Sequence, residues 1–494
     1  MALQRFNNVV AGRSCASSTG RWLETANPFD GRPWAEVPRC GAVDAADAVE
    51  AAHAAFTAGP WPALSATERG KLLQRLGDLV ARDAERLAAL EVRDNGKLHA
   101  EMLGQLRYIP EWFRYFGGLA DKVEGSVLPL DKPQLFAYTK REPLGVIACI
   151  TPWNSPLMLL AWKLAPALAA GNTVVVKPSE FTSCSTLALM ELVAEAGFPA
   201  GVVNTVTGYG AEVGPTLCEH PLVAKVAFTG GDATGASVYA AAAKGIKHVT
   251  LELGGKSANV VFADANLDHA VKGAISGIFA ASGQTCIAGS RLLVQRSVHD
   301  EVSRRLVEFA GRAKLGDPMS SATQVGPITT EAQREKVLHY IDVAKGEGAR
   351  CLLGGGRPKD PGLAGGWFVE PTIFGDVSND MRIAREEVFG PVLSIIPFED
   401  EDDAVAIAND SLYGLAAGVW TTDIRRAVTM ADRLRSGTVW VNTYRAVSFM
   451  APFGGYKRSG IGRENGQAAI DEYLQTKSVW INLAQDVPNP FVMR

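Results

Sequence analysis

The stretch Val146-Ile147-Ala148-Cys149-Ile150, followed by Thr151-Pro152-Trp153-Asn154, begins the part of the chain that decides the fold. Its five apolar residues stop at a polar turn with a proline, which is typical of a buried strand that ends in a loop. Apolar runs follow at 173–176, 202–206, 223–228, 248–253 and 258–262, and helical patterns at 157–170, 183–196, 212–218 and 233–244. This alternation predicts an α/β fold in which helices cover both faces of a parallel sheet.

A sheet of this kind binds its ligand at the carboxyl ends of the strands. The loops at residues 151–155, 177–180, 208–210 and 229–235 follow predicted strands, so we expect them to form the binding site.

The chain has 494 residues, which is enough for two or three domains. Residues 44–120 are predicted to be helical, and a second α/β region is expected from about residue 264 to 441, with strands at 291–295 and 418–420. Residues 121–141 and the tail 473–494, which includes Pro488 and Pro490, have extended patterns. We predict that these two segments pair with each other.

The composition excludes several classes of protein. The net charge is −4, so nothing suggests a nucleic-acid surface, and no apolar run is long enough for a membrane span or a signal peptide. The seven cysteines are scattered, with no CxxC pair, and the seven histidines are isolated. This pattern argues against disulfides and against a metal site, and it favours a reducing cytoplasm.

Cys286 is the most informative candidate for chemistry. It lies in Gly283-Gln284-Thr285-Cys286-Ile287-Ala288-Gly289, among small and polar residues, just after a helical pattern that ends at 282–283. A structural cysteine prefers apolar surroundings, whereas a helix dipole or nearby donors at this place could stabilise a thiolate. We therefore predict a nucleophilic cysteine.

Glu252 is the candidate base. It lies in the apolar run Val249-Thr250-Leu251-Glu252-Leu253. A carboxylate buried in a strand tends to have a raised pKa and can accept a proton near neutral pH.

Three further turns carry candidate binding groups. Phe228-Thr229-Gly230-Gly231 ends a strand and opens a helix, where backbone N–H groups favour a phosphate; a tight turn explains the glycines equally well. Lys177-Pro178-Ser179-Glu180 could bind both hydroxyls of an adenosine ribose through Glu180, and a solvated ion pair is the alternative. The segment Gly208-Tyr209-Gly210 begins a weak glycine motif, which an ordinary strand-to-helix turn also explains.

The remaining candidates are an amide and an acidic pair. Asn154 lies in a stiff turn, and its amide can donate to an oxyanion, although most asparagines at turns only form the turn. Glu387 and Phe389 could hold a second ribose and a planar ring, and the alternative is a helix end with solvated acids.

Together these segments resemble the aldehyde dehydrogenase superfamily. The resemblance runs from Asn27-Pro28 to Thr476-Lys477. Besides the stretches around residues 151–154, 177–180, 228–230 and 283–286, it rests on Leu251-Glu252-Leu253-Gly254-Gly255-Lys256, Glu387-Val388-Phe389-Gly390-Pro391 and Pro452-Phe453-Gly454-Gly455-Tyr456-Lys457.

The resemblance implies a Rossmann-like, parallel-sheet cofactor domain, a second α/β catalytic domain and a small β oligomerisation hairpin. These would comprise residues 1–120 and 144–253, residues 254–445, and residues 121–143 with 473–494. The segments 121–143 and 473–494 would pair subunits into a homodimer or homotetramer.

The resemblance also implies a mechanism and a cofactor. Cys286 would attack the aldehyde, Asn154 would hold the oxyanion, hydride would pass to the nicotinamide, and Glu252 would activate the water that releases the acid. NAD is favoured because Glu180 suits a free 2′-hydroxyl, with NADP as the alternative. The implied cofactor residues are Ile150, Thr151, Pro152, Trp153, Lys177, Ser179, Glu180, Gly208, Gly210, Phe228, Gly230, Gly231, Leu253, Glu387 and Phe389.

One departure concerns the cofactor groove. Much of the family has a serine where this chain has Gly231, so a hydroxyl that would reach the pyrophosphate is missing, and the adjacent Asp232 could further discourage a phosphate.

The implied substrate residues are Trp112, Leu159, Trp162, Ile287, Arg445 and Phe449. Apart from Arg445 they are apolar or aromatic, which favours a medium-chain or aromatic aldehyde, although such residues are also ordinary in a core. Arg445 could pair with the carboxylate of a semialdehyde, or it could be a solvated charge at the rim.

Two other classes within this fold stay open. A CoA-acylating enzyme would transfer the acyl group to a thiol, for which the base Glu252 is not needed. A non-catalytic relative would not require Cys286, Glu252 and Asn154 together. A papain-like hydrolase is disfavoured because no histidine lies in a recognisable partner context.

Overall fold

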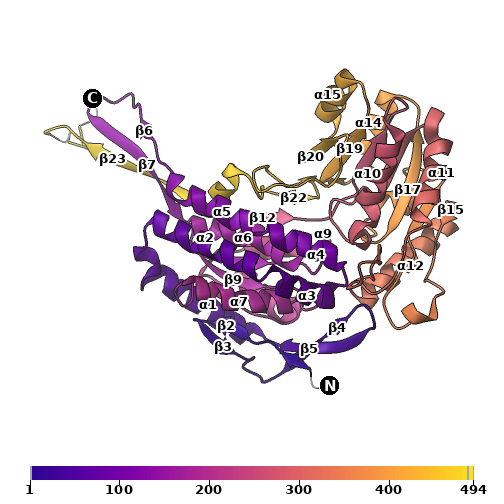
Figure 1. Ribbon diagram of the computed structural model, residues 1–494. Coiled ribbons are helices and arrows are strands. Elements are labelled where there is room, and N and C mark those ends of the chain that lie inside the picture. Colours follow the sequence, from indigo (N-terminus) through magenta and orange to yellow (C-terminus); the bar gives the residue numbers. More distant parts are fainter. Residues whose placement is uncertain (1–2, 487–488, 493–494) are drawn as a thin grey trace.

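The computed structural model describes residues 3–486 and 489–492 of the chain (Figure 1). Residues 1–2 of the predicted cofactor domain, and residues 487–488 and 493–494 of the predicted oligomerisation segment, Pro488 included, lie outside the described residues. Among the described helices none is both long and apolar enough to cross a membrane.

The first sheet contains the predicted alternation. Its strand order is β10-β9-β8-β11-β12-β22, and all of its strands except β22 are parallel to their neighbours. The bounds are β8 Val146–Ile150, β9 Thr173–Lys177, β10 Val203–Thr205, β11 Val223–Thr229, β12 His248–Glu252 and β22 Gly460–Ile461. The α/β prediction is confirmed, and the antiparallel edge strand β22 is an addition that the sequence did not indicate.

Helices cover both faces of this sheet because its strands are apolar on both faces. Val146, Ala148 and Ile150 of β8 pack toward one core, and Ile147 and Cys149 pack toward the other. The first face carries α1 Ala42–Thr57, α8 Gly210–Glu219 and α9 Asp232–Ala243, and the second carries α6 Pro156–Ala169 and α7 Cys184–Ala196.

An outer layer of helices covers α6 and α7. It consists of α2 Ala66–Arg82, α3 Ala84–Asn95, α4 His99–Tyr108 and α5 Pro110–Leu119. Every residue of α6 is buried as a result. The amino-terminal segment forms small sheets from β1 Gln4–Arg5, β2 Asn8–Val10, β3 Arg13–Cys15, β4 Trp22–Asn27 and β5 Arg32–Pro38.

The second sheet has the order β15-β16-β17-β14-β13-β19-β20. Its strands are β13 Ala258–Val261, β14 Arg291–Gln295, β15 Arg350–Leu353, β16 Thr372–Gly375, β17 Val392–Phe398, β19 Ala416–Trp420 and β20 Thr438–Val441. The accompanying helices are α10 Leu267–Phe279, α11 His299–Ala310, α12 Glu331–Gly346, α13 Arg382–Arg385, α14 Glu401–Asn409 and α15 Ile424–Arg433.

The pattern of alternation grouped the run at 258–262 with the first sheet, although the resemblance assigned residues 254–445 to a second domain, and the grouping by pattern was wrong. The strand β13 pairs with β14 and β19 of the second sheet instead. The chain crosses between the sheets at Gly254 and Gly255, where an added Cβ would lie 2.5 Å from Glu387 Oε2 and 2.6 Å from the Cys286 carbonyl oxygen respectively. An apolar run of strand length does not indicate which of two sheets the strand joins.

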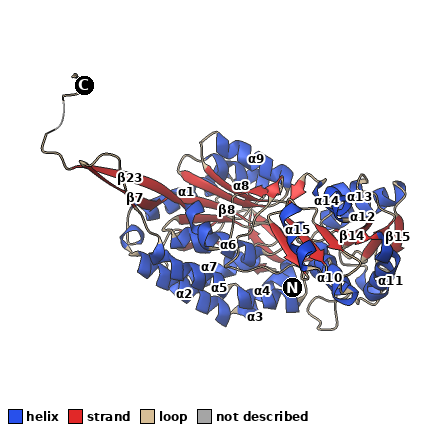
Figure 2. Cartoon of the chain, turned by 90° about the horizontal axis from the view of Figure 1, so that it is seen from above, coloured by secondary structure: helices blue, strands red, loops and turns tan. Residues whose placement is uncertain are grey.

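The predicted pairing of the two extended segments is confirmed. Strand β7 (Leu135–Pro143) pairs antiparallel with β23 (Leu474–Asn482) along its whole length, and β6 (Val127–Leu128) pairs with the other edge of β7. Figure 2 shows β7 and β23 extending away from the body of the protein. The division of the chain into three functional domains stays a prediction.

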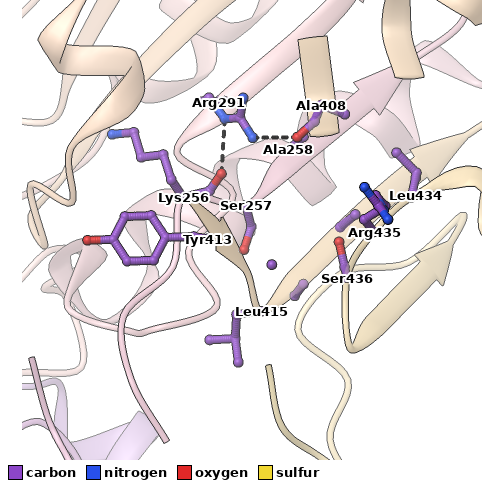
Figure 3. A pocket seen from close by; sticks show the side chains of 13 residues that line it. Lys256, Ser257, Ala258, Arg291, Ala408, Tyr413, Leu415, Leu434, Arg435 and Ser436 are labelled. Carbon is purple, nitrogen blue, oxygen red and sulfur yellow. Dashed lines mark hydrogen bonds between the residues drawn. The ribbon is translucent and has the colours of Figure 1, made fainter. Parts of the chain in front are cut away.

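Arg291 ties the start of the second sheet together. It begins β14, and its guanidinium donates to the carbonyl oxygens of Lys256, Ile407 and Ala408 at 2.9–3.0 Å. Figure 3 shows the bonds to Lys256 and Ala408. Ile407 and Ala408 lie in the last turn of α14, where a cation is favourable. The buried arginine therefore fixes both the carboxyl end of α14 and the segment that follows Glu252.

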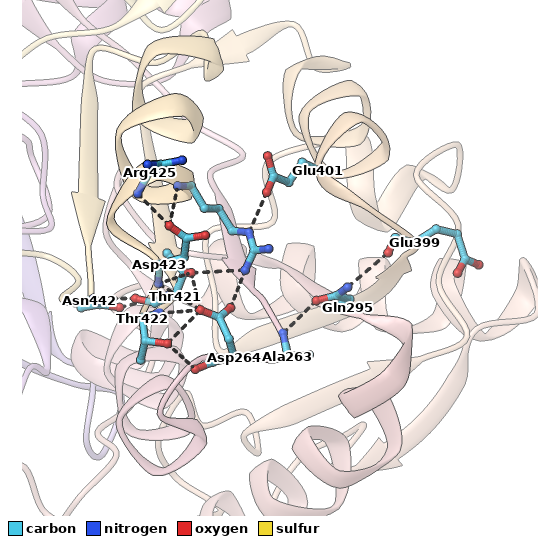
Figure 4. Close-up of polar contacts among 11 residues, drawn as sticks. Ala263, Asp264, Gln295, Glu399, Glu401, Thr421, Thr422, Asp423, Arg425 and Asn442 are labelled. Atoms are coloured by element: carbon cyan, nitrogen blue, oxygen red, sulfur yellow. Dashed lines mark hydrogen bonds and ion pairs between the residues drawn. The ribbon is translucent and has the colours of Figure 1, made fainter.

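Asp264 performs a similar role at the other end of β13. Its carboxylate accepts bonds from Thr421 Oγ1, from the N–H groups of Thr422 and Asp423, and from Arg426 Nη1 at 2.6–3.1 Å (Figure 4). These donors hold the pKa of Asp264 at about 2, below its ordinary value of 3.8, although burial acts in the opposite direction. The loop after β19 and the start of α15 are thereby joined to β13.

This pKa predicts a pH dependence of stability. Because the folded pKa is depressed, the Asp264 carboxylate stabilises the fold above about pH 4, and this contribution is lost as the pH falls toward 2. Asp264→Asn should lower the urea midpoint at pH 7, and the difference from wild type should shrink between pH 4 and 2.

The matched control is Asp342→Asn, at an exposed aspartate of α12 that has no ion pair among the described residues. A constant difference between wild type and Asp264→Asn from pH 7 to 2 would contradict this role.

Candidate active site

A pocket of about 160 Å³ opens at the carboxyl ends of β8, β11 and β12, where the second sheet faces the first. It brings together candidate residues that are far apart in the sequence. Its lining includes Pro152, Trp153, Asn154, Leu159, Gly230, Gly231, Glu252, Leu253, Cys286, Glu387 and Phe389. It also contains Thr229, Gly254, Gln333 and Lys336, which sequence reasoning did not select as site residues.

The other predicted residues lie around this pocket rather than in its lining. Ile150 ends β8, Thr151 follows it, and Phe228 lies within β11. Lys177 ends β9, and the loops after β9 and β10 contain Ser179, Glu180, Gly208 and Gly210. Trp112, Trp162 and Ile287 belong to the core, and Phe449 borders it. Arg445 lies outside this core cluster and bonds to Ser276 of α10.

Cys286 is positioned by an unusual stretch of backbone. After α10 ends, Ala281 and Ser282 adopt positive φ angles of 53° and 51°, and Gly283 follows at 71°. An added Cβ at Gly283 would lie 2.1 Å from the Gly390 carbonyl oxygen, so only glycine fits there. The turn presents Cys286 to the pocket.

The expectation that a helix dipole stabilises the Cys286 thiolate is wrong. The carboxyl end of α10, which carries partial negative charge, precedes Cys286. Burial raises the pKa of the Cys286 thiol to about 12, and the negative charges of Glu252 and Glu387 contribute to this rise. The N–H groups of Cys286 and Ile287 oppose it. The thiol is therefore protonated in the free protein at neutral pH.

Asn154 is tied to the same loop. Its Nδ2 donates one hydrogen to the carbonyl oxygen of Gln284 at 3.0 Å, and the residue is 6% exposed. An amide nitrogen has two hydrogens, so the second can be donated into the pocket.

Glu252 ends β12 and is buried. Neither of its carboxylate oxygens has a hydrogen-bond partner among the described residues. Burial and the neighbouring Glu464 raise its pKa well above the ordinary value, and Lys163 and Arg463 partly oppose this. An added Cβ at Gly454 would lie 2.9 Å from Glu252 Oε1, so the glycine leaves room for the carboxylate. Such a group is suited to accept a proton near neutral pH.

Sequence reasoning missed the groups behind Glu252. Lys163 Nζ donates to Thr229 Oγ1 at 2.6 Å and forms an ion pair with Glu464, and both partners of the pair are at most 3% exposed. The signal was present, since Lys163 interrupts an otherwise apolar helix. Its partner lies 301 residues away, which no local pattern indicates.

Glu387 and Phe389 form the wall opposite Gly230. Glu387 Oε1 accepts a bond from the Gly255 N–H at 3.0 Å, and burial raises the pKa of Glu387. Phe389 has a positive φ of 59° and meets the Trp153 ring edge to face, with centroids 5.2 Å apart.

The start of α9 is open toward the pocket. An added Cβ at Gly231 would meet nothing within 4 Å, whereas at Gly235 it would lie 2.4 Å from Leu253. The close approach at Gly235 lets α9 pack on the strand. Asp232 pairs with Arg458 at 2.9 Å, so its charge, which was expected to discourage a phosphate, is largely offset.

A second polar group lies at the ends of β9 and β10. Lys177 Nζ contacts Glu180 Oε2 at 3.4 Å, and Glu180 Oε1 accepts from the Gly210 N–H at 3.5 Å. Burial lowers the pKa of Lys177. Gly208 has a φ of 140°, and an added Cβ there would lie 2.8 Å from the Cys40 carbonyl oxygen.

Aromatic side chains dominate the region beside Leu159. The rings of Trp112 and Trp162 are stacked with centroids 5.9 Å apart, and Phe449 meets Trp112 edge to face at 5.8 Å. Arg445 is the polar exception, and its Nη1 donates to the Ser276 carbonyl oxygen at 3.0 Å. Ile287 is held by a bond of 3.1 Å from Tyr444 to its carbonyl oxygen.

Comparison with known proteins identifies the architecture. The family model described as the aldehyde dehydrogenase family matches residues 15–479. The chain belongs to the aldehyde dehydrogenase family. The resemblance inferred from the sequence is thus confirmed, and oxidation of an aldehyde is the reaction of this enzyme class.

Several relatives of this aldehyde dehydrogenase match along their whole length. The (Z)-2-((N-methylformamido)methylene)-5-hydroxybutyrolactone dehydrogenase of Acinetobacter baylyi is 47% identical over 100% of both chains. The betaine aldehyde dehydrogenase of Bacillus subtilis is 45% identical over 94% of this chain and 95% of its own.

Solved structures of aldehyde dehydrogenases have the same fold as this chain. The betaine aldehyde dehydrogenase of Staphylococcus aureus in complex with NAD+ has a TM-score of 0.97 at 40% identity, covering 99% of this chain and 97% of its own. An aldehyde dehydrogenase from Bacillus cereus, also in an NAD+ complex, has a TM-score of 0.95 at 43% identity, covering 97% of each chain.

Proposed function

We propose that this aldehyde dehydrogenase uses NAD to oxidise an aldehyde to the carboxylic acid, with Cys286 as nucleophile and Glu252 as general base. The observation that carries the proposal is that Cys286, Glu252 and Asn154 line one pocket with the open start of α9. A nucleophile, a base, an oxyanion donor and a binding site for a cofactor therefore meet at one place.

Deprotonation of Cys286 begins the reaction. The thiol is protonated at rest, so a proton must leave before the sulfur attacks. Glu252 is a suitable acceptor because burial raises its pKa well above that of an ordinary glutamate and so makes it a stronger base. The sulfur then bonds to the aldehyde carbon, and the carbonyl oxygen becomes an oxyanion.

The second Asn154 amide hydrogen and the Cys286 N–H are the donors for that oxyanion. Loss of one donor of this kind typically raises a barrier by about 3 kcal/mol. After oxidation the acyl group is held on Cys286 as a thioester. Glu252 first releases the proton from Cys286 to solvent and then takes a proton from water. The resulting hydroxide attacks the thioester carbon, the carbon–sulfur bond breaks, and the acid leaves while Cys286 departs as thiolate.

The residues present fit NAD. Gly230 and Gly231 line the pocket at the start of α9, and the free space beside Gly231 leaves room for a pyrophosphate. We assign Glu180 to an adenosine ribose and Glu387 to the second ribose. When bound, NAD supplies the two-electron acceptor for the hydrogen of the aldehyde carbon. Glu180 favours NAD over NADP because its charge opposes a 2′-phosphate. The proposed groove is completed by Ile150, Thr151, Lys177, Ser179, Gly208 and Gly210.

The aromatic cluster supports an apolar aldehyde, medium-chain or aromatic, as the substrate. Trp112, Trp162 and Phe449 pack together beside Leu159, which itself lines the pocket. Substrate atoms beyond the aldehyde would lie against these apolar surfaces.

A semialdehyde is the second candidate, and Arg445 favours it. This guanidinium is charged near the Cys286 sulfur, and its Nη1 is engaged by the Ser276 carbonyl oxygen. An arginine has five N–H donors, so the others could pair with a carboxylate at the far end of the substrate.

An assay tests these proposals directly. Purified protein is mixed with NAD or NADP and a panel of aldehydes, and formation of reduced nicotinamide is followed by absorbance. The panel holds octanal, benzaldehyde, succinic semialdehyde, betaine aldehyde and a 5-hydroxybutyrolactone. We expect turnover with NAD in the absence of CoA, and the highest rates for the apolar aldehydes. In Cys286→Ala the rate should fall by at least about 10³-fold.

The ranking separates the alternatives. Preference for succinic semialdehyde that is lost in Arg445→Gln would establish a semialdehyde as the substrate. Turnover only after CoA is added would place the enzyme in the acylating class, and full activity in Cys286→Ala would contradict the mechanism.

We also propose that the chain assembles into a homodimer or homotetramer through β6, β7 and β23, and that it works in the cytoplasm, as its seven free cysteines favour. Exposed apolar side chains gather on these strands: Val127, Phe136, Trp480 and Ile481. An apolar strand edge of this kind needs a cover.

Trp480→Asp should therefore weaken assembly, because it places a charge on the proposed contact. Light scattering should show a lower mass for this variant than for wild type. Phe309→Asp is the matched control, since Phe309 is similarly exposed but lies on α11. An unchanged mass in Trp480→Asp would contradict the proposed interface.

A further inference from the structure

Gln284, which precedes Thr285 and Cys286, is surrounded by buried hydrogen bonds that involve four chain segments. Lys97 Nζ donates to Ser155 Oγ at 3.0 Å. The neighbouring Asn154 Nδ2 donates to the Gln284 carbonyl oxygen, also at 3.0 Å. Lys97 thus reaches the loop of the nucleophile through the same turn that presents the oxyanion donor.

The chain of bonds returns to its starting point. Gln284 Oε1 accepts from the Thr329 N–H at 2.9 Å, and Thr329 Oγ1 donates to the Asn95 carbonyl oxygen at 2.7 Å. Asn95 is two residues before Lys97, and its Oδ1 accepts from the Lys97 N–H at 2.9 Å. The result is a closed ring.

The ring joins the two halves of the site. Asn95, Lys97, Asn154 and Ser155 belong to the part that contains the first sheet, whereas Gln284 and Thr329 belong to the part with the second. All six residues are buried. A buried ring with each member bonded holds the facing segments in one arrangement.

Lys97 is the charged member of the ring and is 1% exposed. The ionisable groups that act on it are Glu91 of α3, Glu101 of α4, Arg445 and the Cys286 sulfur. Burial lowers the pKa of Lys97 to about 8, so the ammonium is largely retained at neutral pH. The proposed reaction steps do not use this cation.

We propose that Lys97 is a positioning residue that holds the Asn154 turn against the Cys286 loop and whose charge stabilises the Cys286 thiolate. The inference rests on the proposed role of Cys286 as nucleophile.

The positive charge of Lys97 opposes the groups that disfavour the Cys286 thiolate. Burial, Glu252 and Glu387 all disfavour the thiolate. Burial lowers the pKa values of the two cations Lys97 and Arg445, whereas the negative charges of Cys286 and Glu101 raise them. Of the two, Lys97 is tied by a hydrogen bond to the residue next to Asn154.

The test measures the rate at which iodoacetamide alkylates Cys286 between pH 6 and 10, with the modified peptide identified by mass spectrometry. In Lys97→Met we expect the rate at pH 7 to fall about tenfold. The difference from wild type should shrink between pH 8 and 10, because Lys97 loses its own charge above about pH 8. Lys97→Arg should restore most of the wild-type profile because it keeps the charge.

Ser155→Ala separates positioning from charge. It removes the acceptor of Lys97 and leaves the ammonium, so the alkylation profile should stay near wild type while kcat falls several-fold and KM for NAD is unchanged. This variant also decides the matter if Lys97→Met does not fold. Lys247→Met is the control, since Lys247 binds the carbonyl oxygens of His220 and Val223 at the far end of β12 and should leave both readouts unchanged.

Two results would overturn the inference: a folded Lys97→Met with the wild-type alkylation profile, or Ser155→Ala with the wild-type kcat. The proposed function fails separately, since an enzyme that turns over no aldehyde can still show the changed profile in Lys97→Met.

Discussion

The burial of the Glu252 carboxylate is the constraint on which the rest of the site depends. A buried carboxylate with no hydrogen bond among the described residues is costly in its charged form, so it holds its proton to higher pH than an exposed glutamate. Lys163, paired with Glu464 behind it, limits that rise. The base is therefore tuned by surroundings that come from α6, β12 and the segment near residue 464.

The two sheets meet where this base is needed. Strands β8, β11 and β12 bring Asn154, Gly230 and Glu252 to one edge, and the second part of the chain supplies Cys286 and Glu387 from the opposite side. Arg291 fixes the crossing between the two parts at Lys256, and the ring through Lys97 fixes it again at Gln284. A site made by two bodies needs such ties, because a displacement of about 1 Å can cost 10²-fold in rate.

Much of this architecture could be predicted from local patterns. The apolar runs that end in polar turns identified β8 to β12, and the unusual sequence neighbours of Cys286 and Glu252 were enough to single out both residues. The strand β13 was placed in the wrong sheet, because only the two glycines at 254–255 mark the crossing and glycines have many uses. The helix dipole at Cys286 was misjudged, since the sequence already placed Cys286 after the carboxyl end of a helix, where the dipole is negative.

What could not be predicted depends on distant partners. Lys163 and Lys97 each stand alone in the sequence, and their meaning comes from Glu464 and Ser155, which lie 301 and 58 residues away.

The central claim, that Cys286 carries the acyl group and Glu252 releases it, is tested most directly by trapping. Glu252→Gln is incubated with NAD and octanal at raised pH, where hydroxide replaces Glu252 as the acceptor of the Cys286 proton. The reaction is quenched in acid, and the mass of the Cys286 peptide is measured. We expect the mass of an octanoyl thioester on Cys286, absent in Cys286→Ala; a Glu252→Gln enzyme that leaves Cys286 unmodified and produces acid at the wild-type rate would contradict the claim.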